Sequence, residues 1–179
     1  IVYSPVYGYM KKRLLTGKTV TNHETGHTIS HTYLYNDTLG CMLPVEEHIT
    51  NSDGNEYTTR TVYPFMLEDG VSRNMADSNM VDIPIKVEKL CGNTLLSTDH
   101  TVYTKTEGMF LPQKQNRTEG GETRTLHTYE MYDSKGNPLY VTTLDGRKFV
   151  FLWGYGNRYP VARIEGATYN EVGTWVGST

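Results

Sequence analysis

The chain contains 179 residues and carries a formal net charge of −3 at pH 7, with a pI near 6.1. This balance argues against a nucleic-acid partner, which favours a basic face. No apolar run reaches the roughly 20 residues that a membrane-spanning helix needs. Because the chain starts at Ile1 without an initiator Met and ends at Thr179 without a closing element, we expect a single module, residues 1–179, from a longer or processed protein.

The composition favours strands over helices. The chain has 14 tyrosines and 17 glycines, Thr is frequent and Ala is scarce, and Thr and Tyr suit a pleated, half-buried surface. Alternating or strand-like runs occupy residues 28–35, 56–63, 124–132 and 147–153. Glycine turns punctuate them at residues 24–26, 52–55, 91–93, 119–121, 134–137 and 144–146. The sequence therefore predicts an all-β fold of successive antiparallel hairpins, forming an extended or curled sheet.

Two short helices interrupt this pattern. Residues 71–80 have little strand character and place Val71, Met75 and Met80 on one helical face. A second helix is expected to begin near Thr168, because Thr168 and Glu171 have the spacing of a capping box.

One unit occurs twice in the chain, in copies of about residues 18–64 and 85–132 that are offset by roughly 66–68 residues. Each copy is interpreted as strand, glycine turn, strand, Leu-Pro corner, strand, glycine turn, strand. Such hairpin pairs cannot bury a face alone, so we expect neighbouring copies to stack. The matching landmarks are Gly26 with Gly92, Tyr35 with Tyr103, Gly40 with Gly108, Leu43-Pro44 with Leu111-Pro112, Gly54 with Gly120 and Tyr63 with Tyr129.

The C-terminal part contains the run Tyr132-Asp133-Ser134-Lys135-Gly136. This run resembles the Tyr-Asp-x-x-Gly core of YD repeats, which occur in RHS proteins, teneurins and toxin-complex shell proteins. Together with the segments that follow it, it makes residues 124–172 similar to a large group of RHS-like proteins from Bacteroidetes, most of them without assigned activity. Those later segments are Asp145-Gly146, residues 151–155, residues 159–162 and residues 167–169.

The resemblance implies β-hairpin repeats that spiral into a sheet or shell. It also implies export, with display at the cell surface, adhesion or packaging of a toxic domain. The chain departs from the family because it lacks the aspartyl self-cleavage segment and a recognisable toxin domain. No catalytic residue is therefore carried over from the family.

The run His23-Glu24-Thr25-Gly26-His27 matches the H-E-x-x-H pattern of zinc hydrolases. That chemistry needs a helix, which places both imidazoles on one face beside a glutamate base. Here Gly26 interrupts the pattern and β-branched, alternating residues flank it, so we predict a hairpin turn with no cofactor. A zinc-dependent hydrolase using His23, Glu24 and His27 is the alternative. A second metal hypothesis places His27 and His31 together on one strand face.

Trp153, Tyr155, Tyr159 and Trp175 lie close in sequence. Exposed aromatic rings can stack on sugars, which gives a glycan-binding domain as a further alternative, but packing at a strand corner is the preferred interpretation. Asp133 is expected to accept hydrogen bonds from turn amides at Gly136.

Two other candidate sites are given no catalytic role. Glu46 and Glu47 are adjacent on a strand and should face opposite sides, which argues against a carboxylate pair. The pattern of Cys41 and Cys91 leaves a disulfide between them open.

The sequence thus favours a non-enzymatic structural or interaction module. Its expected partners are neighbouring repeats of the same parent chain, with cell-surface or glycan partners as further candidates.

Overall fold

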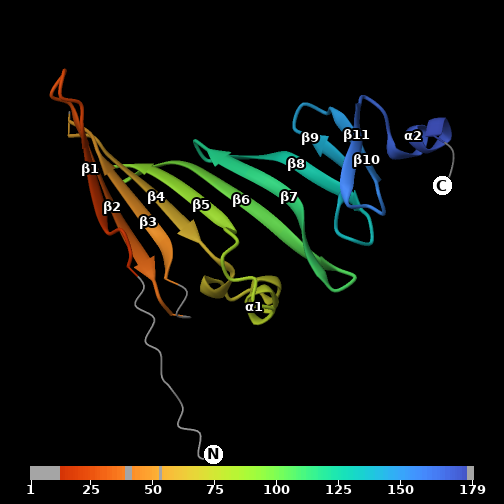
Figure 1. The fold of residues 1–179 in the computed structure, drawn as a ribbon, viewed down its shortest axis with the longest axis horizontal. Helices are drawn as coiled ribbons and strands as arrows, with labels where there is room; N and C mark the ends of the chain where they lie inside the picture. Colours follow the sequence, from red (N-terminus) through yellow and green to blue (C-terminus); the bar gives the residue numbers. More distant parts are fainter. Residues whose placement is uncertain (1–12, 39–41, 53, 177–179) are drawn as a thin grey trace, which may run out of the picture.

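The computed structural model describes residues 13–38, 42–52 and 54–176. Within these residues, eleven strands form a single antiparallel sheet in which every strand pairs with its neighbours in sequence. Figure 1 shows this meander running from β1 at one end to β11 at the other. The all-β prediction of successive antiparallel hairpins with two short helices is confirmed.

The strands follow chain order and are joined mostly by tight turns. They are β1 (Gly17–Thr21), β2 (Thr28–Asn36), β3 (Leu43–Thr50), β4 (Glu56–Val62), β5 (Lys86–Cys91), β6 (Thr94–Thr106), β7 (Met109–Glu119), β8 (Glu122–Tyr132), β9 (Pro138–Thr143), β10 (Lys148–Gly154) and β11 (Tyr159–Glu165). A 3-10 turn, η1 (Pro64–Met66), precedes helix α1 (Gly70–Asp77), and helix α2 (Tyr169–Val176) follows β11.

Both predicted helices are present, and each begins at a side-chain cap. Asp69 caps α1 by accepting hydrogen bonds from the backbone N–H groups of Val71 and Ser72 at 3.1 and 2.9 Å. At α2, the Thr168 N–H donates to the Glu171 carboxylate at 2.7 Å, and the Glu171 N–H donates back to the Thr168 hydroxyl at 3.4 Å. This reciprocal pair is the capping box that the sequence predicts.

Positive backbone φ angles close the central hairpins. Glu107 and Gly108 have φ values of 50° and 83°, and Gly120 and Gly121 have values of 57° and 84°. Positive φ at both central residues is the conformation that suits the right-handed twist of the flanking strands. The predicted glycine turn at residues 119–121 therefore joins β7 to β8 directly.

The Leu-Pro pairs do not form corners, contrary to the sequence-based expectation. Pro44 lies in β3 opposite Tyr35, and Pro112 lies in β7 opposite Tyr103, each beside a shift in strand register. Proline has no N–H for the ladder, so it is tolerated where a bulge already interrupts pairing. The second copy turns instead at Glu107-Gly108, whereas Gly40 lies outside the described residues.

The two proline bulges receive similar hydrogen bonds. The Tyr63 hydroxyl donates to the Pro44 carbonyl at 3.0 Å, and the Tyr132 hydroxyl donates to the Pro112 carbonyl at 2.5 Å. Judged by this contact, Tyr132 is the counterpart of Tyr63. Burial is the first cause that raises the pKa of Tyr132, so its hydroxyl stays protonated and able to donate.

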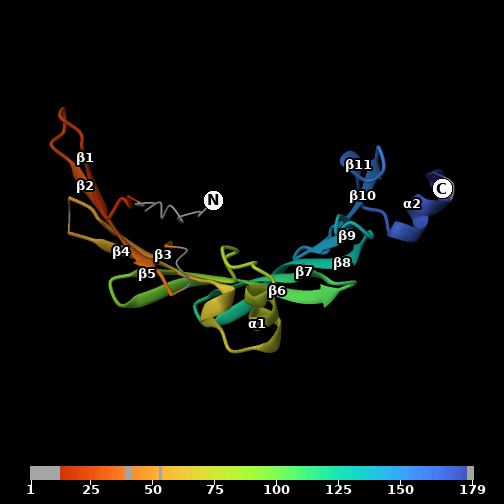
Figure 2. The same cartoon turned by 60° about the horizontal axis from the view of Figure 1, so that its bottom comes forward.

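Among the residues that the structure describes, the core is divided into two small clusters. Met75 of α1 packs with Ile85 and Phe110, and Val172 of α2 packs with Val150 and Ala167. Figure 2 shows the sheet as a curved single layer with α1 on one side. Elsewhere the sheet has apolar side chains in contact with solvent, including Val20 (55% exposed) and Leu95 (51% exposed). In the described part of the chain, no helix is long and apolar enough to cross a membrane.

Candidate functional site

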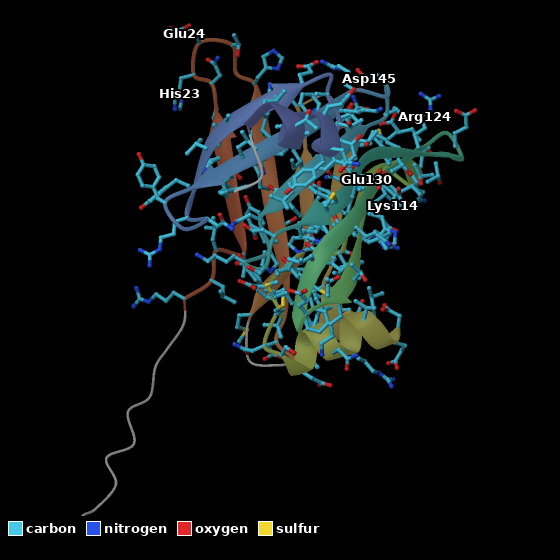
Figure 3. All side chains as sticks on the ribbon, turned by 90° about the vertical axis from the view of Figure 1, so that its right-hand side faces the viewer. His23, Glu24, Lys114, Arg124, Glu130 and Asp145 are labelled. Atoms are coloured by element: carbon cyan, nitrogen blue, oxygen red, sulfur yellow. The ribbon has the colours of Figure 1, made fainter. Side chains whose placement is uncertain are left out.

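The His-Glu segment forms the tip of the β1–β2 hairpin. The Asn22 N–H donates to the His27 carbonyl at 2.8 Å, and the Gly26 N–H donates to the Asn22 carbonyl at 2.8 Å. Gly26 has a φ of 73°, which glycine adopts without strain. Figure 3 shows His23 and Glu24 at the outer end of this hairpin. The segment is therefore a turn between two strands and does not supply the helical face of an H-E-x-x-H site.

His31 lies on β2 and is engaged by a carboxylate. Its Nδ1 lies 2.9 Å from Oε1 of Glu47, the residue diagonally across on β3. His27 belongs to the turn before β2, so it is not a strand neighbour of His31. Among the residues that the structure describes, no group of three or more His, Cys, Asp or Glu side chains is arranged to hold a metal ion.

Glu46 and Glu47 have different partners. Glu46 contacts the Arg60 guanidinium at 2.8 Å and His48 at 3.0 Å, whereas Glu47 contacts His31. Residues that pair directly across strands share a face, so the Glu46–Arg60 pair lies on one face and Glu47 on the other. The two carboxylates therefore do not act on one substrate atom.

The Tyr-Asp run forms the turn between β8 and β9. One Asp133 carboxylate oxygen accepts the N–H groups of Lys135 at 2.8 Å and Asn137 at 2.9 Å, and the other accepts the Asn137 side-chain amide at 2.9 Å. The predicted bonding of turn amides by Asp133 is therefore present, but it uses the residues on either side of Gly136, whose own N–H donates to the Asp133 backbone carbonyl at 3.0 Å. The carboxylate reaches across the turn to Asn137 instead.

These contacts set the charge of Asp133. Desolvation raises its pKa, but hydrogen bonds from Asn137 and Lys135 outweigh that effect and hold the pKa below its ordinary value. Asp133 is therefore ionised at neutral pH.

The same turn also binds the β10–β11 connection. The Asn137 side-chain amide donates to the Asn157 carbonyl at 2.9 Å, and the Lys135 ammonium donates to the Gly156 carbonyl. Sequence reasoning missed Asn137 and Asn157. The only signals for them were the Gly136-Asn137 and Gly156-Asn157 pairs, which predict turns but not a contact between two turns.

Trp153 lies near the end of β10 and packs against β9. Its indole N–H donates to the Pro138 carbonyl at 2.9 Å, which supports the packing interpretation of this side chain. Tyr155 and Tyr159 behave differently, since they are 79% and 63% exposed. Their rings meet edge to face at a centroid distance of 6.1 Å. The expectation that they pack a corner is wrong, because each borders a turn and no element of the described part of the chain covers it. The Trp175 side chain lies outside the described part.

Cys91 is partly exposed at the end of β5 and forms no disulfide with another described residue. Cys41 lies outside the described residues, so the pairing of the two cysteines stays open.

No protein-family model and no curated protein matches the chain.

Proposed function

We propose that the chain is a non-enzymatic structural and interaction module of an exported bacterial surface or shell protein of the RHS type. Two observations support this proposal. The sheet is an uninterrupted meander of hairpins, and the Tyr-Asp turn, whose sequence resembles the YD core, ties successive hairpins together through Asn137. The observation that carries the proposal most directly is that, within the described residues, both outer strands present an open hydrogen-bonding edge.

The open edge of β1 follows from its pairing with β2. The Tyr33 N–H donates to the Thr16 carbonyl at 3.0 Å, and the Asn22 N–H donates to the His27 carbonyl at 2.8 Å. Because antiparallel residues alternate between facing the partner strand and facing away, Gly17, Thr19 and Thr21 direct their main-chain groups outward. In the described part of the chain no strand pairs with this edge.

The open edge of β11 follows in the same way. The Gly166 N–H donates to the Lys148 carbonyl at 2.9 Å, so Ala162 and Ile164 face β10 in register with Leu152 and Val150. Arg163 and Glu165 therefore direct their main-chain groups away from the sheet. An unpaired edge is a template for a further strand. In the parent protein, neighbouring repeats of the same chain would supply those strands.

An edge-blocking experiment tests the proposal. Thr19→Pro and Arg163→Pro each remove an outward N–H and leave the internal ladder intact. We expect the wild-type chain to associate with rising concentration in sedimentation equilibrium and the double variant to stay monomeric with an unchanged far-UV circular dichroism spectrum. Val20→Pro and Ile164→Pro are the matched controls, which remove inward N–H groups and should disrupt the sheet. A wild-type chain that stays monomeric at every concentration would contradict the proposal.

The alternative of a zinc hydrolase has its own test. His23 and Glu24 lie in a hairpin turn, which supports a structural role for the segment. We expect purified protein to contain no stoichiometric zinc by elemental analysis. One zinc per chain that is lost in His23→Ala would overturn this expectation.

A further inference from the structure

A cavity lies where β9 and β10 separate. The two strands pair only from Lys148 to Val150, opposite residues 140–142, although β10 continues to Gly154. Beyond this point the strands are linked by the Trp153 indole, which donates to the Pro138 carbonyl at 2.9 Å. The cavity has a volume of about 490 Å³. Small-molecule sites typically measure roughly 300–1,000 Å³, so one or two sugar rings would fit.

The walls of this cavity combine aromatic and polar groups. The described residues that line it include the aromatic residues Phe151, Trp153 and Tyr169 and the polar residues Asp133 and Asn157. The Trp153 N–H is already bound to Pro138, which fixes the orientation of the indole. Asn157 is held in place because the Asn137 side-chain amide donates to its backbone carbonyl. The site is thus built from side chains and turns that other contacts hold in place.

The charges of the cavity select the class of ligand. Asp133 is ionised because hydrogen bonds from Asn137 and Lys135 overcome desolvation and lower its pKa. No Lys, Arg or His belongs to the described residues that line the cavity. The nearby Lys135 charge acts on Asp133, but it is not part of the wall, so an anionic ligand would meet a carboxylate without a basic side chain beside it in the lining. A neutral polyol suits the site, because its hydroxyls can donate to a carboxylate and its C–H face can lie on an aromatic ring.

We propose that this cavity binds a neutral carbohydrate, with aromatic rings of the wall against the sugar face and Asp133 accepting hydrogen bonds from its hydroxyls. The exposed edge-to-face pair of Tyr155 and Tyr159 lies on either side of Asn157 in sequence, with Tyr155 in the β10–β11 connection and Tyr159 at the first residue of β11. This binding is separate from strand addition at the edges, so either can fail without the other.

Titration with neutral disaccharides tests the proposal. The probes are cellobiose, lactose and N,N′-diacetylchitobiose, and the readout is the NMR signal of the Trp153 indole N–H. We expect saturable movement of this signal with at least one probe. Failure of all three to move it, or movement only with an anionic sugar such as sialyllactose, would overturn the proposal.

A matched pair of variants separates the cavity from the rest of the surface. Val161 lines the cavity and is 56% exposed, and Val20 on β1 is 55% exposed. Val161→Arg places a guanidinium on the wall, where it competes with the sugar for Asp133, and should weaken binding about tenfold, or ~1.4 kcal/mol. Val20→Arg should leave binding unchanged. Equal affinities in the two variants would assign the sugar to another surface and overturn the proposal.

Discussion

Gly136 shows, at the scale of one residue, why the Tyr-Asp turn needs glycine. Its φ is 81°, a conformation that a side chain rarely adopts. A Cβ at this position would also lie 3.0 Å from Leu111 Cδ2 and 3.3 Å from Met109 Sδ. The turn therefore lies directly on the β6–β7 hairpin, and the glycine is required by both its conformation and its neighbours.

Replacing Gly136 separates these two requirements. Gly146 has a similar φ of 77°, but a Cβ there would meet nothing within 4 Å. Gly146→Ala should lower the free energy of unfolding by roughly 1–2 kcal/mol through conformation alone, and Gly136→Ala should lower it further. Chemical denaturation measures both. In a Leu111→Ala background, the difference in unfolding free energy between the two variants should shrink. If the two variants lose the same free energy of unfolding in the wild-type background, the close approach of Gly136 to Leu111 would be refuted.

Asp145 gives a pH-dependent prediction at the same scale. The Thr143 hydroxyl and then Arg147 lower its pKa from 3.8 to about 2. A carboxyl whose pKa is depressed on folding contributes stability above its unfolded pKa, and that contribution is lost as pH falls from about 4 towards about 2. NMR titration should give a midpoint near 2 that rises in Thr143→Val and is unchanged in Thr142→Val. A wild-type midpoint of 3.8 would show that these hydrogen bonds are absent in solution.

At the scale of elements, local chemistry predicted the secondary structure well. The run at residues 28–35 became β2, residues 124–132 fell within β8, and the cap spacing at Thr168 located α2. The long strands β6 and β7 were harder to recognise. In the described residues, most of the sheet has no element packed on either of its faces. Polar side chains such as Thr, Lys, Gln and Asn therefore lie on both faces of these strands, and the usual alternation of apolar and polar residues is weak.

The two core clusters should stabilise different parts of the sheet. Met75 and Val172 are 0% and 1% exposed and belong to separate clusters. Met75→Ala should cost about 2–5 kcal/mol and speed amide hydrogen exchange in β5 to β7, with little effect on β10 and β11. Val172→Ala should show the reverse distribution. Uniform acceleration across all strands in both variants would mean that the sheet unfolds as one cooperative unit.

The candidate site depends on contacts between turns, which the sequence could not reveal. Trp153 was identified as a packed aromatic, but its acceptor, the Pro138 carbonyl, depends on where β9 begins. Tyr155 and Tyr159 were expected to pack. Their exposure could not be predicted, because the sequence does not distinguish an exposed aromatic residue in a turn from a packed one. Asn157 entered the site only because the Asn137 amide reaches its carbonyl.

At the scale of the whole molecule, the chain is an open sheet with little core. Its strands pair only with sequence neighbours, so each hairpin is stabilised by the next one and the two outer strands lack a partner on one side in the described residues. The sequence-based expectation that hairpin repeats need neighbours stays a prediction. The proposed function therefore depends on the sheet edges.

Hydrogen exchange at the edge amides is the most direct test of that account. The outward N–H groups of Thr19 and Arg163 should exchange rapidly at low protein concentration and become protected as concentration rises. The inward N–H groups of Val20 and Ile164 should be protected throughout. If Thr19 and Arg163 exchange rapidly at every concentration, even under conditions where the chains associate, then partners do not join through the strand edges and the proposed role is contradicted.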